Sequence, residues 1–287
     1  MPARLILNAD DFALTRGINR AVGELAAAAA LTSTTLMASG AAFEDSVSIA
    51  RRHPQLGVGC HVVLVDGRPV SPPEVVPSLV GPGGTFRPTL QQFVPALMTG
   101  QIRPDEILRE AVAQIRKLQH AGIAVTHVDT HKHTHIFPTV TRCLVEAAEL
   151  CGVPAIRNPF EPEWCINLHQ GDWKRRTVVR LMASWRQRFI SMEPVRNARL
   201  RTTDGTVAIS VTGKMDSGAL ARILHALPES GTYELCCHPG YNDADLDLVT
   251  TRLREHRDVE RSALLQEVPR LMRRQHAPRL IHYGNLV

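Results

Sequence analysis

The segment 126–135 holds the side chains best suited to chemistry. Five of its residues fall on alternate positions: His127, Asp129, His131, His133 and His135. Alternate residues share one face of an extended strand, so one short strand would present four imidazoles and a carboxylate. Imidazole and carboxylate are the usual protein ligands of divalent metals such as zinc. The pattern therefore predicts a metal site; the alternative is a His-rich tract that binds metal without catalysis.

Two adjacent carboxylates, Asp10 and Asp11, follow the apolar run Leu5–Leu7. Such a run is typical of a buried parallel strand that delivers polar groups at its C-terminal end. Neighbouring side chains of an extended backbone point apart, so one carboxylate can bind a metal while the other stays free as a base. The alternative is that an Asp caps the next helix. His61, within an apolar strand, becomes a ligand candidate only through its partnership with Asp11 and His131.

The composition favours a globular protein over a nucleic-acid-binding or membrane-spanning one. Of 287 residues, 44% are hydrophobic, which is enough for a large core. The formal net charge of +5 is weak evidence for nucleic acid, and the aromatic residues, at 5%, are not interleaved with basic ones. No apolar run reaches the roughly 18 residues that a transmembrane helix needs. We expect neither a nucleic-acid partner nor a membrane span.

The cysteines and the first residues predict a cytoplasmic location. Six cysteines occur without a CxxC pair, so buried reduced thiols are expected rather than a disulfide framework. Cys60 and Cys237 directly precede His61 and His238, and on a strand they would point to the opposite face and pack as small core residues. The chain enters strand-like sequence at once, with no charged-then-apolar signal region.

Strand-like and helix-like segments alternate along the chain, which predicts an α/β fold with a parallel sheet. The expected strands lie at residues 5–7, 33–39, 57–65, 126–135, 153–157, 207–211, 233–237 and 280–283. No stretch resembles a linker, so we expect a single domain over 1–287, folded as an irregular TIM-like (β/α) barrel. Active sites of such barrels lie at the C-terminal ends of the strands. Six candidates fall at or near such ends: Asp10, Asp11, His61, His131, Arg157 and His238.

Residues 66–95 interrupt this alternation with many prolines and glycines. So long a stretch without regular structure inside a compact domain is usually a functional loop or a disordered insertion. We favour a loop that covers the substrate.

Residues 173–192 read as one basic amphipathic helix. Its apolar residues recur at helical spacing: Val178, Leu181, Met182, Trp185 and Phe189. Its basic residues are Lys174, Arg175, Arg176, Arg180, Arg186 and Arg188. One interpretation is a surface helix packed on the core or on the partner of a homodimer. The other is an interfacial helix that lies on anionic lipid.

Taken together, the motifs resemble those of the YdjC-like (ChbG-type) carbohydrate deacetylases. They are Leu7-Asn8-Ala9-Asp10-Asp11-Phe12, Gly59-Cys60-His61, and the stretch from His127 to His135 with Pro138. The resemblance is ordered and runs from the first expected strand to the last. One departure is Ala13, where the family usually has Gly; Ala would be strained at a position that needs positive φ.

A further stretch, Val-Leu-Val-Asp-Gly-Arg-Pro-Val at 63–70, resembles the hopanoid-biosynthesis-associated subgroup called HpnK. That resemblance implies an N-acetylglucosamine carried on a bacteriohopanetetrol-type lipid as the substrate. It also gives an interfacial helix a purpose, since the enzyme would then work at the inner face of the membrane.

The family resemblance implies one divalent metal ion held by three residues: Asp11, His61 and His131. It further implies Asp10 as the catalytic base, His238 as the general acid, and Arg157 as the partner of the base. A three-ligand site leaves positions open for water and substrate, where a metal polarises a carbonyl and lowers the pKa of bound water. Both zinc and magnesium stay open as the metal.

The other members of the His-rich segment are assigned to support. His127 and Asp129 are expected to orient a ligand histidine, and His133 and His135 either line the pocket or serve the fold. Two rival functions remain. A metal-dependent phosphoesterase would need two or three metals and more carboxylate ligands, and a non-catalytic metal-binding protein would not need Asp10.

Overall fold

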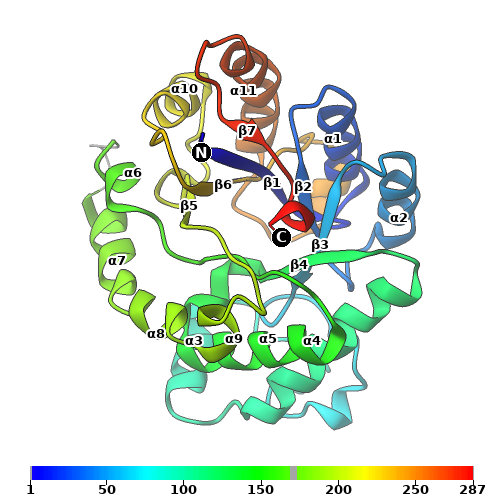
Figure 1. Cartoon of the computed structure of the whole chain (residues 1–287). Helices are drawn as coiled ribbons and strands as arrows, with labels where there is room; N and C mark the ends of the chain where they lie inside the picture. Colours follow the sequence, from blue (N-terminus) through cyan, green and yellow to red (C-terminus); the bar gives the residue numbers. More distant parts are fainter. Residues whose placement is uncertain (1, 169–172, 287) are drawn as a thin grey trace.

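Seven parallel strands form the centre of the molecule in the computed structural model, which describes residues 2–168 and 173–286 (Figure 1). They are β1 (Arg4–Phe12), β2 (Ser33–Leu36), β3 (Gly57–Val62), β4 (Val125–Thr130), β5 (Gly205–Val207), β6 (Thr232–Cys237) and β7 (Arg279–Leu280). Their order is β4-β3-β2-β1-β6-β5, and β7 pairs with β1. The apolar side chains of Leu5, Ile6 and Leu7 are fully buried, as expected for a central parallel strand.

Single bridges carry the sheet on from β4 towards β5. Val128 bridges to Ile156, and Ala155 bridges to Arg201, four residues before β5 begins. The backbone N–H of Ile156 donates to the carbonyl of Arg201 at 2.8 Å. The sheet therefore curls into the irregular TIM-like barrel that the alternation predicted, with the weakest pairing between β4 and β5.

Helices surround this sheet in Figure 1. They are α1 (Arg16–Ala27), α2 (Phe43–Arg52), α3 (Leu90–Met98), α4 (Pro104–His120), α5 (Pro138–Cys151), α6 (Glu163–Asn167), α7 (Trp173–Ala183), α8 (Arg186–Ile190), α9 (Glu193–Arg196), α10 (Ser217–His225) and α11 (Glu255–Met272). Short 3-10 turns lie at η1 (Pro73–Val75), η2 (His131–Ile136), η3 (Ile209–Val211), η4 (Ala244–Leu248) and η5 (Tyr283–Asn285). Among the described residues, none of the helices combines the length and the apolar character needed to cross a bilayer.

Several expected strands are shorter than predicted. The segment 153–157 contributes only its bridges, and the segment 207–211 is wrong as a strand, because Ala208 turns into the left-handed region at φ 75° and a 3-10 turn follows. The last strand ends at Leu280, and η5 begins at Tyr283. The apolar residues of these segments predicted where the strands lie. Backbone turns near the C-terminal ends of the strands, called the barrel mouth below, end these strands early.

The stretch 66–95 is ordered and anchored rather than loose. Carboxylate oxygens of Glu110, buried on α4, accept from the backbone N–H of Val70 at 2.8 Å and of Ser71 at 3.0 Å. The end of the stretch is helix α3 despite Pro95, because Phe93 and its neighbours pack into the core. Whether the loop covers a substrate stays a prediction.

The segment 173–192 is not one helix, which corrects the sequence prediction. It breaks after Ala183 into α7 and α8, and the N–H of Trp185 donates to the carbonyl three residues earlier, at Met182. The break lets the Trp185 ring pack against Phe137, with ring centroids 5.7 Å apart, and lets Phe189 be buried. The second half of the expected apolar stripe therefore packs on the core, and α7 stays on the surface.

Candidate metal centre and active site

Strand β1 ends in a strained turn that separates its two carboxylates. Asp11 has φ 65° and Ala13 has φ 81°, so both depart from the extended backbone. The family position usually held by Gly is therefore one of positive φ, and Ala occupies it under strain. Neither Asp caps α1, because Thr15 accepts from the N–H of Ile18 at 3.2 Å. Both carboxylates are buried and face different partners.

Asp11 meets the two histidines predicted to share a metal with it. Its Oδ1 lies 3.5 Å from Nε2 of His61 and 3.1 Å from Nδ1 of His131. The three donors come from the ends of β1, β3 and β4, and their ligand atoms lie within 4.8 Å of one another. Asp11 and His61 are buried, and the His131 side chain is 17% exposed. Strand ends from separate parts of the chain thus meet at one point, as barrel geometry requires.

The donor set fits a divalent metal ion. Nδ1 of His61 lies 2.7 Å from Oδ1 of Asp129, so the Nδ1–H donates a hydrogen bond to the Asp129 carboxylate and Nε2 faces Asp11. Oδ1 of Asp11 is buried without a hydrogen-bond partner among the described residues. Burial opposes protonation of His61, but the nearby carboxylates of Asp129 and Asp10 outweigh it and raise its pKa to about 10. A cation between Nε2 and Oδ1 would take the place of that proton.

Arg257 holds the other oxygen of Asp11. Its Nη2 donates to Asp11 Oδ2 at 2.6 Å, its Nε donates to the carbonyl of Leu253 at 2.9 Å, and its side chain is only 1% exposed. Burial alone would raise the pKa of Asp11, yet Arg257, with the two histidines, holds it well below the usual range. The Asp11 carboxylate is therefore ionised and fixed in orientation from α11.

Arg157 is fully buried among three carboxylates. It donates two hydrogen bonds to Asp10, from Nη2 to Oδ1 at 2.6 Å and from Nη1 to Oδ2 at 2.9 Å. It also lies 2.5 Å from Asp129 Oδ2 and 2.6 Å from Glu234 Oε1. Burial works against the ionised form of Asp10, but the Arg157 charge, followed by that of His61, holds the Asp10 pKa well below its ordinary value. Asp10 is thus an ionised carboxylate on the side of β1 away from Arg257.

His238 follows β6 directly and reaches the same carboxylate. Its Nε2 lies 3.7 Å from Asp10 Oδ2, and its backbone N–H donates to Glu260 on α11 at 2.6 Å. Gly240 lies two residues on, and its N–H donates to the carbonyl of Arg257 at 3.1 Å. One turn of α11 therefore positions both the His238 loop and Asp11.

After Thr130 the histidines do not continue along one strand face, which corrects the sequence prediction. Strand β4 ends at Thr130, and Lys132 and His133 adopt left-handed backbone angles within η2. His127 lies on β4 itself, as predicted, and stacks on Tyr283, with ring centroids 3.8 Å apart. His135 is buried with its Nδ1 2.7 Å from the hydroxyl of Thr130.

Burial, the largest cause, lowers the pKa of all three rings, that of His133 to about 3. Their roles in support or pocket lining stay predictions.

Sequence reasoning missed three site residues: Glu234, Cys236 and Arg257. Glu234 and Cys236 alternate with His238 along β6, so the same period-2 argument used for β4 would have placed them on one face. Arg257 lies on a helix of mixed character, and nothing in its local sequence signals a buried ion pair.

Comparisons with known proteins show the family to which this chain is related. The sequence model of the family described as YdjC-like protein matches residues 4–274. A carbohydrate deacetylase of Homo sapiens is 33% identical over 83% of this chain and 75% of its own length. One from Geobacillus stearothermophilus is 30% identical over 86% of this chain and 83% of its own length. One from Brevibacillus brevis is 40% identical, over 55% of this chain and 60% of its own length.

A solved structure supports the fold. A protein of Enterococcus faecalis V583, whose description proposes cellobiose-phosphate cleavage, superposes with a TM-score of 0.79 over the whole of both chains at 22% identity. The near-complete match to the family model decides the matter: this chain belongs to the YdjC-like protein family.

Proposed function

We propose that this protein is a metal-dependent hydrolase that removes the acetyl group from an N-acetylated amino sugar. One observation carries the proposal: the donors Asp11, His61 and His131 lie next to a buried carboxylate, Asp10, that itself faces His238. The relatives named carbohydrate deacetylase support the same reaction class.

Asp11, His61 and His131 would hold the metal, which when bound polarises an amide carbonyl and acidifies a water. Asp10, kept ionised by Arg157, accepts the proton of the attacking water. His238, whose Nε2 lies 3.7 Å from Asp10 Oδ2, donates a proton to the departing sugar amine. Arg157 keeps its other carboxylate partners, Asp129 and Glu234, throughout, so Asp10 need not move.

The rival functions are less well supported by the same contacts. A phosphoesterase with two or three metals needs several carboxylates that bridge them, whereas the group of Asp11, His61 and His131 contains a single carboxylate. A non-catalytic metal-binding protein needs no second buried carboxylate beside the donors. The arrangement favours hydrolysis of an amide at a single metal.

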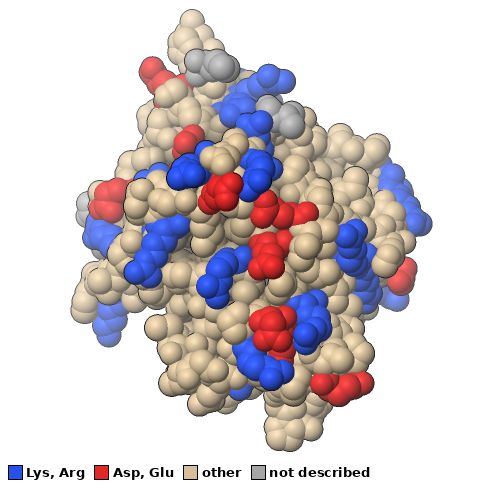
Figure 2. Space-filling view, turned by 60° about the horizontal axis from the view of Figure 1, so that its bottom comes forward, with Lys and Arg blue, Asp and Glu red and all other residues tan. Residues whose placement is uncertain are grey.

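The substrate we propose is N-acetylglucosamine carried on a hopanoid lipid of the bacteriohopanetetrol type, processed by a cytoplasmic enzyme at the inner face of the membrane. Support comes from α7, at the left edge of Figure 1, where Trp173, Val178 and Leu181 are 68%, 51% and 67% exposed beside basic residues. Apolar groups flanked by Lys and Arg suit an anionic lipid surface. The face seen in Figure 2 intersperses Lys and Arg with Asp and Glu.

The test is acetate release. Protein stripped with a chelator and reloaded with zinc, magnesium or manganese is given a soluble N-acetylglucosamine oligomer, a lipid-linked N-acetylglucosamine and a phosphate monoester. We expect acetate and a new primary amine from the sugars only, and no turnover without metal. The His131→Ala variant should lose both bound metal and activity. Phosphate release, or metal-free acetate release at the full rate, would overturn the proposal.

A further inference from the structure

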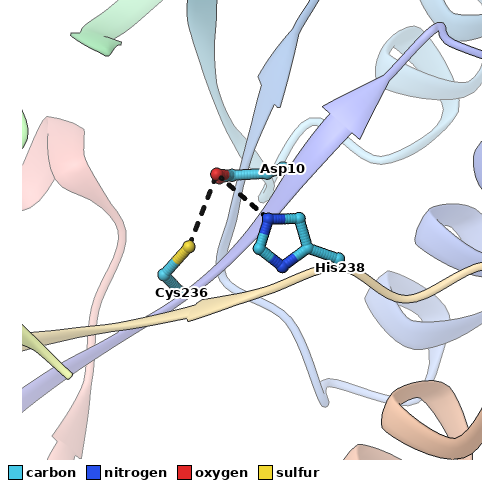
Figure 3. A group of neighbouring side chains, drawn as sticks. All are labelled: Asp10, Cys236 and His238. Carbon is cyan, nitrogen blue, oxygen red and sulfur yellow. Dashed lines mark hydrogen bonds and ion pairs between the residues drawn. The ribbon is translucent and has the colours of Figure 1, made fainter. Parts of the chain in front are cut away.

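A cysteine thiol lies in direct contact with the base, and the mechanism does not use it. Cys236 precedes His238 by two residues on β6, so both side chains point towards Asp10 (Figure 3). Its Sγ lies 3.4 Å from Asp10 Oδ2, the oxygen that His238 Nε2 approaches at 3.7 Å. The neighbouring Cys237 faces the other way, with its Sγ 3.2 Å from the carbonyl of Asn8.

These three side chains have the dimensions of a metal site of their own. Zinc bonds of about 2.3 Å to sulfur and about 2.0–2.2 Å to nitrogen or oxygen place tetrahedral ligands roughly 3.3–3.6 Å apart. The distance of 3.4 Å from Cys236 Sγ to Asp10 Oδ2 lies within that range, and the distance of 3.7 Å from His238 Nε2 to the same oxygen lies just beyond it. All three ligand atoms lie within 4.8 Å of one another, and none of them belongs to the group of Asp11, His61 and His131.

We propose that Asp10, Cys236 and His238 form a second, inhibitory site for a soft divalent cation such as Zn²⁺ or Cd²⁺. Thiolate sulfur selects soft metals over magnesium or manganese, so this site and the first would differ in preference. The inhibitory role rests on the function proposed above, because the cation would occupy the base and the acid together.

The charge balance around the site permits a cation there. When the metal binds, the Cys236 thiol releases its proton to solvent and the sulfur forms the new bond as a thiolate. Asp10 Oδ2 then shares its lone pairs between the cation and Arg157, whose charge is also met by Asp129 and Glu234. No oxidant is needed, and the first metal site stays intact.

The experiment follows cadmium, because a cadmium–thiolate bond gives an ultraviolet charge-transfer absorption that oxygen and nitrogen ligands do not. Enzyme already loaded at its first site is titrated with Cd²⁺ while absorption and acetate release are recorded. In the parent, we expect the absorption to grow as activity falls. The Cys236→Ser variant should show no such absorption, and roughly 10- to 100-fold more Cd²⁺ should be needed to halve its own cadmium-free activity.

Cys237→Ser is the matched control, since that thiol is equally buried on the same strand but faces away from Asp10; it should behave as the parent does. Cys236→Ala, checked by thermal unfolding, replaces the serine variant if the latter does not fold. Absence of the absorption in the parent, or equal cadmium sensitivity of Cys236→Ser, would overturn the site. The absorption reports binding whatever the substrate is, so failure of the proposed deacetylation is seen separately, as absent acetate release before any cadmium is added.

Discussion

The barrel mouth and the surface helix α7 differ in how their charged and apolar side chains are held. At the mouth, Arg157 is fully buried, and three carboxylates surround its guanidinium. On α7, apolar side chains such as Leu181 face solvent, and Arg180 makes an exposed ion pair with Glu163 at 2.9 Å. A buried charge is stable only where oppositely charged partners compensate its loss of hydration. An ion pair on the surface contributes little to stability. The contrast teaches that the mouth is built for fixed geometry and that α7 is a surface available for contact.

Removing one buried charge should show the contrast most strongly. Arg157→Met leaves Asp10, Asp129 and Glu234 buried without their common partner, and we expect the free energy of unfolding to fall by about 3–5 kcal/mol. Arg180→Gln on α7, the control, should change it by less than about 1 kcal/mol. Urea unfolding measures both. Similar small losses in the two variants would break the comparison.

A substitution that keeps the shape of the mouth separates chemistry from stability. Asp10→Asn retains the side-chain volume but cannot accept the water's proton, so turnover should fall by about 10²- to 10⁴-fold. Metal content, measured by elemental analysis, should stay that of the parent, since Asp10 is not among the proposed donors. Near-normal acetate release would remove Asp10 from the reaction.

Acid should weaken the mouth through its buried neutral histidines. Burial lowers the pKa of His127 and His135 well below the ordinary 6.5. Below about pH 6.5 these histidines therefore bind protons in the unfolded chain but not in the folded one. The free energy of unfolding falls as the pH falls. Two such groups imply a loss of about 2 kcal/mol between about pH 6.5 and pH 5.5. Urea unfolding of His135→Gln should show a shallower pH dependence; an unchanged slope would contradict the assignment.

The smallest effect on stability, and a specific effect on binding, is expected at α7. Changing the exposed Val178 and Leu181 to Ser should leave the unfolding free energy within about 0.5 kcal/mol. Sedimentation with anionic vesicles should nevertheless weaken, and so should deacetylation of a lipid-linked sugar, while a soluble sugar is processed as before. Leu150→Ser, equally exposed on α5 at 58%, is the control. Equal vesicle binding by all three proteins would argue against a lipid contact.

Local pattern predicted most of what lies on strands, and tertiary contacts decided the rest. Asp11, His61 and His131 lie together at the barrel mouth because strand ends meet there whatever segments join them. The two-residue period failed after Thr130, because Lys132 turns left-handed and ends the shared face. Arg257 could not be foreseen, since a buried arginine in a helix is defined by the carboxylate it meets.

The pairing of β1 has a consequence for the order of folding. Strand β1 pairs with β6 along one edge and with β2 and β7 along the other. Its neighbours therefore come from both ends of the described chain. Contacts of such sequence separation, 228 residues between Arg4 on β1 and Thr232 on β6, carry a large loop-closure cost and form late. During synthesis the proposed metal donors all emerge early, whereas β1 keeps an open edge until β6 is made. The nascent chain thus contains the proposed metal donors well before β6 completes the pairing of β1, and in that interval the exposed strand edge is the part most in need of protection from aggregation.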